Sequence, residues 1–515
     1  MLKYTYFMFG KFGSINKNYL FYLFVFVIVA IGIYVRVRFY LSEQPMWIDE
    51  IMLASSFMER SLSDFFLPLD AFQKAPPLFV FLILVVKKIF GASVLSLRLI
   101  PFICSILSIF GFFFLLKNNI KNEFGIIAGM SMFTFCLPIV YFSAEFKPYG
   151  CDVFICIVLL LLYKYFNFEK ISLKQLLVYI LGTLFFVFLS YPAILLIPAL
   201  IFSKMYKSNS IDKKILWIFL AIFAAILLLF LSDLNTYIFL KNYWGNIENG
   251  FSVYPSLDFI KTFICSCCEY YIYNYNPQVF YAVIILIFGG FLIIYKENKE
   301  KSLLIFLIMI FAIIASLINA YPLKPKLALY MFPIFLLLIV KFYDLKINSK
   351  LLNVILSIFL LFIFGVNIPY INVSENDLIF YNKLSDGRNK SIEDRSAVRD
   401  YCLKIIQNYK NGDIILASEE FIYSIKCYKA YLRINKNFNI ISYAGISDKL
   451  VTEIDMYSVT NNIIRNKNSS VWIIGRNDEE YFKCPNFGDI KNIIDKYNLK
   501  YEKFVHDDLY LFVIY

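Results

Sequence analysis

A short stretch of clustered charge, Ser42–Leu78, follows the first long apolar run of this chain. It holds the adjacent acids Asp49 and Glu50 and, further along, Lys74. Charged groups at a membrane boundary are costly to desolvate, so they are usually kept for a purpose. Trp47 precedes the acids and an apolar helical pattern follows them, which favours a loop that lies on a bilayer surface and presents a catalytic acid. The alternative is a polar loop whose charges only keep it out of the lipid.

Three further polar clusters follow along the chain. They comprise Arg98; Glu145, Lys147, Tyr149 and Asp152; and Lys324 and Lys326. A group of cations beside a membrane suits the phosphate or diphosphate of a lipid, and a nearby acid can deprotonate a hydroxyl. Sugar transfer from a polyprenyl phosphate needs both, because the leaving phosphate must be stabilised while a carboxylate takes the proton of the attacking hydroxyl. Each cluster also has a structural alternative, such as a snorkelling Arg98 or a local pair of Glu145 with Lys147.

The composition predicts a polytopic α-helical membrane protein. The chain has 515 residues, of which 60% are hydrophobic and 19% aromatic, whereas soluble proteins are about 45–50% apolar. Apolar runs long enough to cross about 30 Å of hydrocarbon recur along it, the first of them being a retained span and not a cleaved signal. Eleven spans are expected, at 19–40, 94–116, 124–142, 149–166, 174–189, 191–206, 214–232, 278–295, 302–319, 327–341 and 351–370.

The segment 78–90 is apolar but short, and it ends with Lys87 and Lys88. If it lies in the interface and does not cross, the loops assigned to the cytoplasm hold 18 Lys and Arg, and the opposite turns hold only Lys147, Lys324 and Lys326. Because cytoplasmic loops are enriched in Lys and Arg, this arrangement is favoured. It predicts a multi-pass protein with a cytoplasmic N-terminus. The first external loop, 42–93, and the other polar clusters then share the outer face.

The last part of the chain has the pattern of a soluble α/β domain. The expected domains are a membrane domain at 1–370 and an extracytoplasmic domain at 371–515. Strands are predicted at 412–416, 439–443, 470–474, 501–505 and 509–515, and helices at 419–432, 452–465 and 489–497. Alternating strands and helices favour a small three-layer sheet domain. From Tyr370 onward, 20 Lys and Arg balance 20 Asp and Glu, so the net charge of +12 lies in the membrane part and nucleic acid is not an expected partner.

The order of these pieces resembles the GT-C glycosyltransferases, in particular the bacterial branch with the lipid A aminoarabinose transferases, the protein O-mannosyltransferases and the RgtA/B/C/D-like proteins. The resemblance covers about residues 20–345 and implies a location in the bacterial inner membrane. It rests on four elements in order: Trp47-Ile48-Asp49-Glu50; Lys74-Ala-Pro-Pro-Leu78; Phe90-Gly91 with Leu97-Arg98-Leu99; and Ser143-Ala-Glu145-Phe-Lys147-Pro-Tyr149 with Asp152. Ala75 departs from the usual residue of the second element, which bears on how Lys74 is seated.

The resemblance implies a role for each residue. Asp49, with Glu50 beside it, would be the catalytic carboxylate. The donor phosphate would be held by Lys74, Arg98, Lys147, Lys324 and Lys326. Supporting or sugar-binding roles would fall to Glu145, Tyr149 and Asp152.

The sequence therefore predicts a glycosyltransferase that moves a hexosyl or pentosyl group, with inversion, from a polyprenyl-phosphate donor to an extracytoplasmic lipid, glycan or protein. Membrane lipid is the other expected partner. No cofactor is expected; the acids could hold a divalent cation, but no ligand spacing demands one. The competing hypotheses are a transporter or flippase for lipid-linked glycans, which would favour internal repeats and polar residues in mid-span, and a non-catalytic membrane scaffold.

Overall fold

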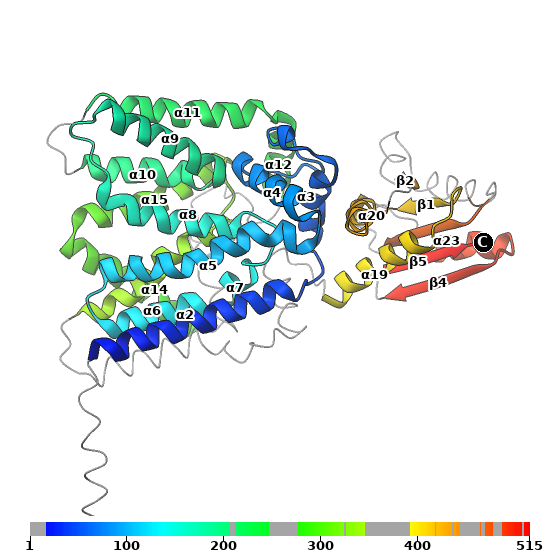
Figure 1. Cartoon of the computed structure of the whole chain (residues 1–515), viewed down its shortest axis with the longest axis horizontal. Helices are drawn as coiled ribbons and strands as arrows, with labels where there is room; N and C mark the ends of the chain where they lie inside the picture. The colour runs from blue at the N-terminus through cyan, green and yellow to red at the C-terminus, as the bar shows by residue number, and fades with distance from the viewer. Residues whose placement is uncertain are drawn as a thin grey trace, which may run out of the picture. The chain divides into compact units, whose positions relative to one another are not determined.

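The fold is that of a computed structural model, shown in Figure 1. It describes residues 17–206, 212–246, 277–323, 326–345, 392–417, 419–434, 437–442, 464, 469–476, 487–506 and 509–515. The chain divides into two compact units. Unit 1 comprises Met1–Ser42, Ala75–Ile83 and Arg98–Asn372, and unit 2 comprises Glu43–Lys74, Leu84–Leu97 and Val373–Tyr515. The first external loop and the C-terminal domain, which are far apart in the sequence, are therefore parts of one unit.

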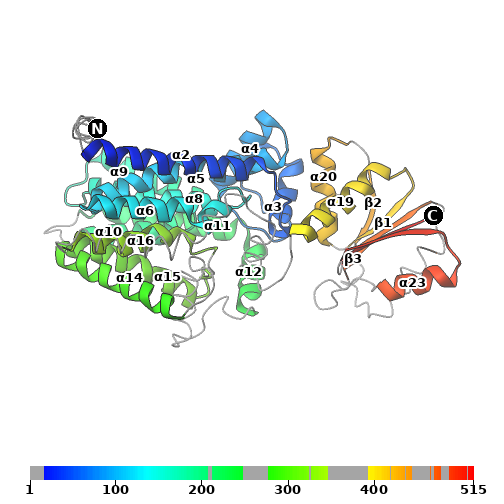
Figure 2. The same cartoon turned by 90° about the horizontal axis from the view of Figure 1, so that it is seen from below.

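Unit 1 is helical, and its long helices run side by side with nearly parallel axes (Figures 1 and 2). Its helices are α2 (Lys17–Leu41), α5 (Val94–Asn119, whose first turn counts with unit 2), α6 (Glu123–Phe135), α7 (Leu137–Tyr141), α8 (Tyr149–Leu162), α9 (Leu173–Leu189), α10 (Ala193–Met205), α11 (Ile215–Leu231), α12 (Leu234–Asn246), α14 (Pro277–Glu297), α15 (Lys299–Leu317) and α16 (Phe332–Val340). Short 3₁₀ turns are η2 (Tyr163–Tyr165), η4 (Leu329–Met331) and η5 (Lys341–Asp344). The segment 78–90 forms α4 (Pro77–Phe90), and the division between the units passes through it.

Each predicted span within the described residues coincides with a helix, although the one at 124–142 is interrupted. The span at 124–142 breaks at Cys136 between α6 and α7, where Pro138 lacks the N–H that a continuous helix needs. Among the described residues, three helices are long and apolar enough to cross a membrane, namely Tyr19–Leu41, Val94–Asn119 and Lys299–Leu317. A fourth would be α11 with α12, which are bent by 87°. The eleventh predicted span, 351–370, lies outside the described residues, so the count of eleven stays a prediction.

A buried arginine joins three of these helices. Arg36 of α2 is fully buried; its Nε donates to Ser105 Oγ at 2.9 Å, and one of its terminal nitrogens donates to the carbonyl oxygens of Gly32 and Thr134 at 3.1 and 2.9 Å. These bonds connect α2 with α5 and α6. The stacked rings of Tyr40 and Phe102, with centroids 4.2 Å apart, bring the C-terminal end of α2 beside the N-terminal part of α5.

Unit 2 contains a five-stranded sheet with the order β2-β1-β3-β5-β4. The strands are β1 (Ile414–Ala417), β2 (Asn439–Ser442), β3 (Val471–Arg476), β4 (Tyr501–His506) and β5 (Leu509–Ile514). β1 pairs in parallel with β2 and β3, whereas β5 is antiparallel to β3 and to β4. All five predicted strands are present within three residues of their expected ends.

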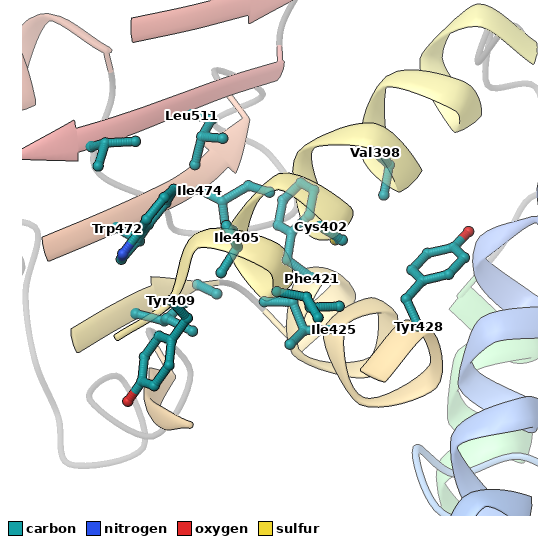
Figure 3. Close-up of a cluster of buried hydrophobic side chains, with 14 of the residues drawn as sticks. Val398, Cys402, Ile405, Tyr409, Phe421, Ile425, Tyr428, Trp472, Ile474 and Leu511 are labelled. Atoms are coloured by element: carbon teal, nitrogen blue, oxygen red, sulfur yellow. The ribbon is translucent and has the colours of Figure 1, made fainter. Parts of the chain in front are cut away.

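Helices cover both faces of this sheet, so the predicted three-layer arrangement is confirmed. On one face, α19 (Ile392–Asn408) and α20 (Glu419–Tyr431) pack on strand residues such as Trp472, Ile474 and Leu511 (Figure 3). On the other face, α23 (Phe487–Lys496) packs on a second cluster that includes Ile473 and Phe512. The sequence pattern did not predict α19, and most of the predicted helix at 452–465 lies outside the described residues.

The first external loop contributes two further helices to unit 2, α3 (Ile48–Glu59) and the single turn η1 (Leu62–Asp64). Helix α3 packs on α20 of the C-terminal domain. The loop with the adjacent acids is thus an ordered part of the sheet-containing unit.

Candidate active site

The predicted site residues fall into two groups. Asp49, Glu50 and Lys74 belong to unit 2, and the residues of the other three clusters belong to unit 1. Lys324 lies outside the described residues. The structure locates each group within its own unit, and that the two groups meet in one site stays a prediction.

The adjacent acids occupy the first turn of α3 and differ in their surroundings. Glu50 is 1% exposed, and its Oε2 accepts a hydrogen bond from the backbone N–H of Trp47 at 3.0 Å. This contact satisfies one of the N–H groups that a helix leaves unpaired at its start. Asp49 is only partly buried. Of the two predicted catalytic residues, Glu50 therefore has a capping role, and Asp49 is the stronger candidate for the base.

Lys74 lies at the end of a tight turn. Two preceding residues, Ala71 and Phe72, adopt left-handed backbone conformations with φ of 53° and 50°. Such conformations are unfavourable for residues other than glycine and are often found at functional sites. The carbonyl oxygen of Ala75, the residue after Lys74, accepts a hydrogen bond from the Tyr191 hydroxyl at 2.9 Å. The backbone on both sides of Lys74 is therefore constrained.

Close helix packing brings the second and third clusters together in unit 1. Gly150 lies at the start of α8, and a Cβ there would stand 3.0 Å from the carbonyl oxygen of Pro101. Pro101 is one turn after Arg98 on α5, so the N-terminal ends of α5 and α8 lie side by side. The rings of Phe79 and Phe146, 6.2 Å apart, bring the helix after Lys74 to the segment between Glu145 and Lys147.

The fourth cluster reaches the same end of the unit. Helix α8 packs on η4, the turn that begins three residues after Lys326. Burial, and then the negative charge of Asp152, raise the pKa of Tyr321, which lies five residues before Lys326. Asp152 Oδ1 accepts a hydrogen bond from Ser190 Oγ at 2.7 Å. The polar residues at 98, 145–152 and 326 therefore converge at one end of unit 1, as their predicted positions on one face of the membrane require.

The charges at this end are removed from bulk water. Arg98, Lys147 and Lys326 are 3%, 8% and 6% exposed, and Glu145 and Asp152 are equally buried. Buried ionic groups are held by partners and dipoles in a medium where electrostatic interactions are strong. A cluster of three buried cations with two acids is suited to an anionic group such as a phosphate. Among the residues that the structure describes, no group of three or more His, Cys, Asp or Glu side chains could hold a metal ion.

Several residues that support this site have no signal in the sequence. Ser190, Tyr191 and Arg36 are ordinary members of apolar segments, and their partners lie 38, 116 and up to 98 residues away. Lys87, near the end of the short apolar segment 78–90, donates from Nζ to the carbonyl oxygens at the C-terminal end of α3. Only the tertiary structure identifies these contacts.

Comparison with known proteins supports the predicted resemblance. Residues 74–232 match the family described as dolichyl-phosphate-mannose-protein mannosyltransferase. The fold is similar to the crystal structure of ArnT from Cupriavidus metallidurans bound to undecaprenyl phosphate, with 11% identity, a TM-score of 0.55 and coverage of 98% of each chain. It is also similar to that protein in the apo state, with 11% identity, a TM-score of 0.52 and coverage of 95% of this chain and 97% of the other. No curated protein matches the chain.

The predicted GT-C resemblance is thus confirmed for the fold across almost the whole chain. The family match covers three of the four polar elements, those that contain Lys74, Arg98 and residues 145–152. The apolar helices and the similarity in fold together support an integral membrane protein.

Proposed function

From its GT-C fold, we propose that this chain is a membrane-embedded glycosyltransferase that uses a polyprenyl-phosphate-linked sugar. It transfers a hexosyl or pentosyl group, with inversion, to an extracytoplasmic lipid, glycan or protein. The N-terminus is cytoplasmic, and the C-terminal domain lies outside the cytoplasmic membrane. The observation that supports this most is the convergence of Arg98, the 145–152 segment and the turn after Lys326 at one end of unit 1.

The donor phosphate is the ligand that this end would accept. Arg98, Lys147 and Lys326, with Lys74 and Lys324, supply the positive charge that stabilises a leaving phosphate. Arg98 offers a planar fork of N–H donors, and the lysines act as point charges. Glu145, Tyr149 and Asp152 orient these cations or contact the sugar. The similar ArnT structure was solved with undecaprenyl phosphate bound, which agrees with a lipid phosphate as the shared ligand.

The reaction is a single displacement at the anomeric carbon. The acceptor oxygen attacks from the side opposite the phosphate, and its bond to the anomeric carbon forms as the bond to the phosphate oxygen breaks. The acceptor proton passes to Asp49, and the lipid phosphate leaves as an anion. A single displacement inverts the configuration, because no enzyme carboxylate is glycosylated on the way.

The proposal is tested by changing Asp49 to Asn in the full chain in nanodiscs. Synthetic undecaprenyl-phosphate hexoses and pentoses are supplied with a cell-envelope extract as acceptor, and released undecaprenyl phosphate is measured by mass spectrometry. Loss of a general base typically lowers the rate about 10²- to 10⁴-fold, so at least a 10²-fold loss is expected. Glu43→Gln, a carboxylate-to-amide change in the same loop at an exposed position, is the matched control.

Full activity of the Asp49→Asn variant would overturn the assignment of the base. Movement of intact lipid-linked sugar across the bilayer without release of the lipid phosphate would instead establish the transporter hypothesis. If the chain supports neither transfer nor transport, the hypothesis of a non-catalytic membrane scaffold remains.

A further inference from the structure

The C-terminal domain packs directly on the helix that holds Asp49. Helix α20 lies against α3 within unit 2. At one point the Tyr431 hydroxyl lies 3.4 Å from the Met46 sulfur, and at another the Cys427 thiol lies 3.6 Å from the carbonyl oxygen of Ile51. Cys427 is 1% exposed and Ile51 is 3% exposed, so this contact is a packed interior and not a surface touch.

A second helix of the domain reaches the first turn of α3. The guanidinium carbon of Arg395, in the first turn of α19, lies 4.5 Å from the centroid of the Trp47 ring. Both side chains are buried. A cation over an indole face is strongest where water is excluded. Trp47 is the residue before α3, and its backbone N–H donates a hydrogen bond to the Glu50 carboxylate. Arg395 therefore contacts the residue that directly precedes the first turn of α3, the turn that contains Asp49.

Ion pairs at the edge of this contact add little. Lys426 of α20 lies 3.9 Å from a Glu59 oxygen and 3.6 Å from an Asp70 oxygen, and the acids are well exposed. Exposed pairs of this kind contribute little to stability. The buried contacts, Arg395 on Trp47 and α20 on α3, therefore fix the helix.

Helix α3 depends on such support because it is short. It has 12 residues, and isolated helices of that length are marginal in water. Its orientation, and with it the direction of the Asp49 carboxylate, must come from the elements packed on it. A misplacement of a catalytic group by about 1 Å can cost about 10²-fold in rate.

We propose that Arg395 is a positioning residue that holds Trp47, and through it the first turn of α3, so that Asp49 is correctly oriented for proton transfer. The C-terminal domain then has a role in catalysis. This inference rests on the proposed function of Asp49.

The test compares Arg395→Ala with Arg395→Lys and with Arg399→Ala in the full chain in nanodiscs. Arg399 is one turn further along the same helix, is partly exposed and pairs with Asp400 at 3.2 Å, which makes it a matched control. Arg395→Ala is expected to lower kcat about tenfold and to leave the donor KM within about twofold. Arg395→Lys, which keeps a cation over the ring, should restore most of kcat, and Arg399→Ala should match the unchanged chain.

Trp47 provides a readout that does not need the reaction. Removal of the guanidinium should change the tryptophan emission and its quenching by acrylamide, and this difference should vanish in a Trp47→Phe background. If Arg395→Ala does not fold, Trp47→Leu removes the same contact from the other side and should lower kcat similarly.

The outcomes separate the two proposals. If Asp49→Asn is inactive while Arg395→Ala and Trp47→Leu both keep the full kcat, the positioning role is overturned and the glycosyltransferase proposal stands. If Asp49→Asn is fully active, the role of Asp49 fails, whatever the emission of Trp47 reports. An equal loss of kcat in Arg395→Ala and Arg399→Ala also overturns the positioning role. So does a change in tryptophan emission that persists in the Trp47→Phe background.

Discussion

Adjacent residues of the same charge have different surroundings in this protein. Asp49 and Glu50 are neighbours in the sequence, but Glu50 is buried and accepts the Trp47 N–H, whereas Asp49 is partly exposed. The first turn of a helix separates two successive side chains by about 100°, so one can face the helix start while the other faces the site. The resemblance implied Asp49 as the catalytic carboxylate with Glu50 beside it, and the structure adds the capping contact of Glu50.

This difference predicts the behaviour of Glu50 variants. The amide oxygen of Glu50→Gln can still accept the Trp47 N–H, so this variant should keep kcat within about threefold, against the 10²-fold loss or more expected for Asp49→Asn. Glu50→Ala removes the acceptor and should destabilise α3 by about 1 kcal/mol. Release of undecaprenyl phosphate measures the first effect, and hydrogen exchange of the α3 amides measures the second. Complete inactivity of Glu50→Gln would give Glu50 a direct part in the chemistry.

The two ends of α5 allow a paired test of phosphate binding. Arg98 is buried near its N-terminal end, and Lys117 is exposed near its C-terminal end. A hydrogen bond to a charged group contributes about 1.5–3 kcal/mol, so Arg98→Gln should weaken binding of undecaprenyl phosphate at least tenfold. Arg98→Lys should recover part of the affinity by keeping the charge, and Lys117→Gln should change nothing. Equal affinities for the Arg98 and Lys117 variants in native mass spectrometry would exclude Arg98 from the phosphate site.

At the scale of elements, α3 is fixed at both ends. Its start has the Glu50 cap, and at its end Lys87 Nζ donates to the carbonyl oxygens of Phe57, Met58 and Arg60, the latter two at 3.0 Å. The last carbonyls of a helix lack partners within the helix, and a cation there also interacts favourably with the helix dipole. Burial lowers the pKa of Lys87, although the Glu59 charge acts in the opposite direction. Of the two lysines at the end of the segment 78–90, Lys87 thus has structural partners.

Lys87→Met should therefore loosen α3 locally. The loss of about 1 kcal/mol of capping corresponds to roughly fivefold faster hydrogen exchange of the amides of 48–59. Lys88, the next residue, is exposed, so Lys88→Met is the matched control and should leave exchange unchanged. If both variants exchange alike, Lys87 does not hold the helix in solution.

At the scale of the whole molecule, the distribution of charge predicts orientation. The loops assigned to the cytoplasm hold 18 Lys and Arg, against three lysines in the opposite turns, and positive loops stay inside. A tag placed after Tyr515 should be removed by protease added to spheroplasts and protected in inverted vesicles. A tag before Met1 should show the reverse pattern. If protease removes both tags from the same side of the membrane, the number of spans is even or α4 crosses the membrane.

Much of the fold follows from local sequence patterns. The run Leu509–Tyr515 is continuously apolar and the segment at 419–432 is amphipathic, and the structure places β5 and α20 there. Helix α19 was missed because its 17 residues mix charged and apolar side chains without a clear stripe. Helix α12 continues from α11 after a bend of 87°. A bend of this kind depends on packing, which a single segment does not encode.

The sequence by itself determined the membrane character, the C-terminal α/β domain and the residue types of the candidate site, because apolar run length, strand alternation and charge are local properties. The tertiary structure alone decided that Glu50 caps α3, that Ser190 and Tyr191 support the Asp152 and Lys74 segments, and that the first external loop packs on the C-terminal domain. These contacts join residues up to 385 positions apart. Their energies arise from packing, burial and hydrogen-bond geometry in the folded chain, and no local pattern contains that information.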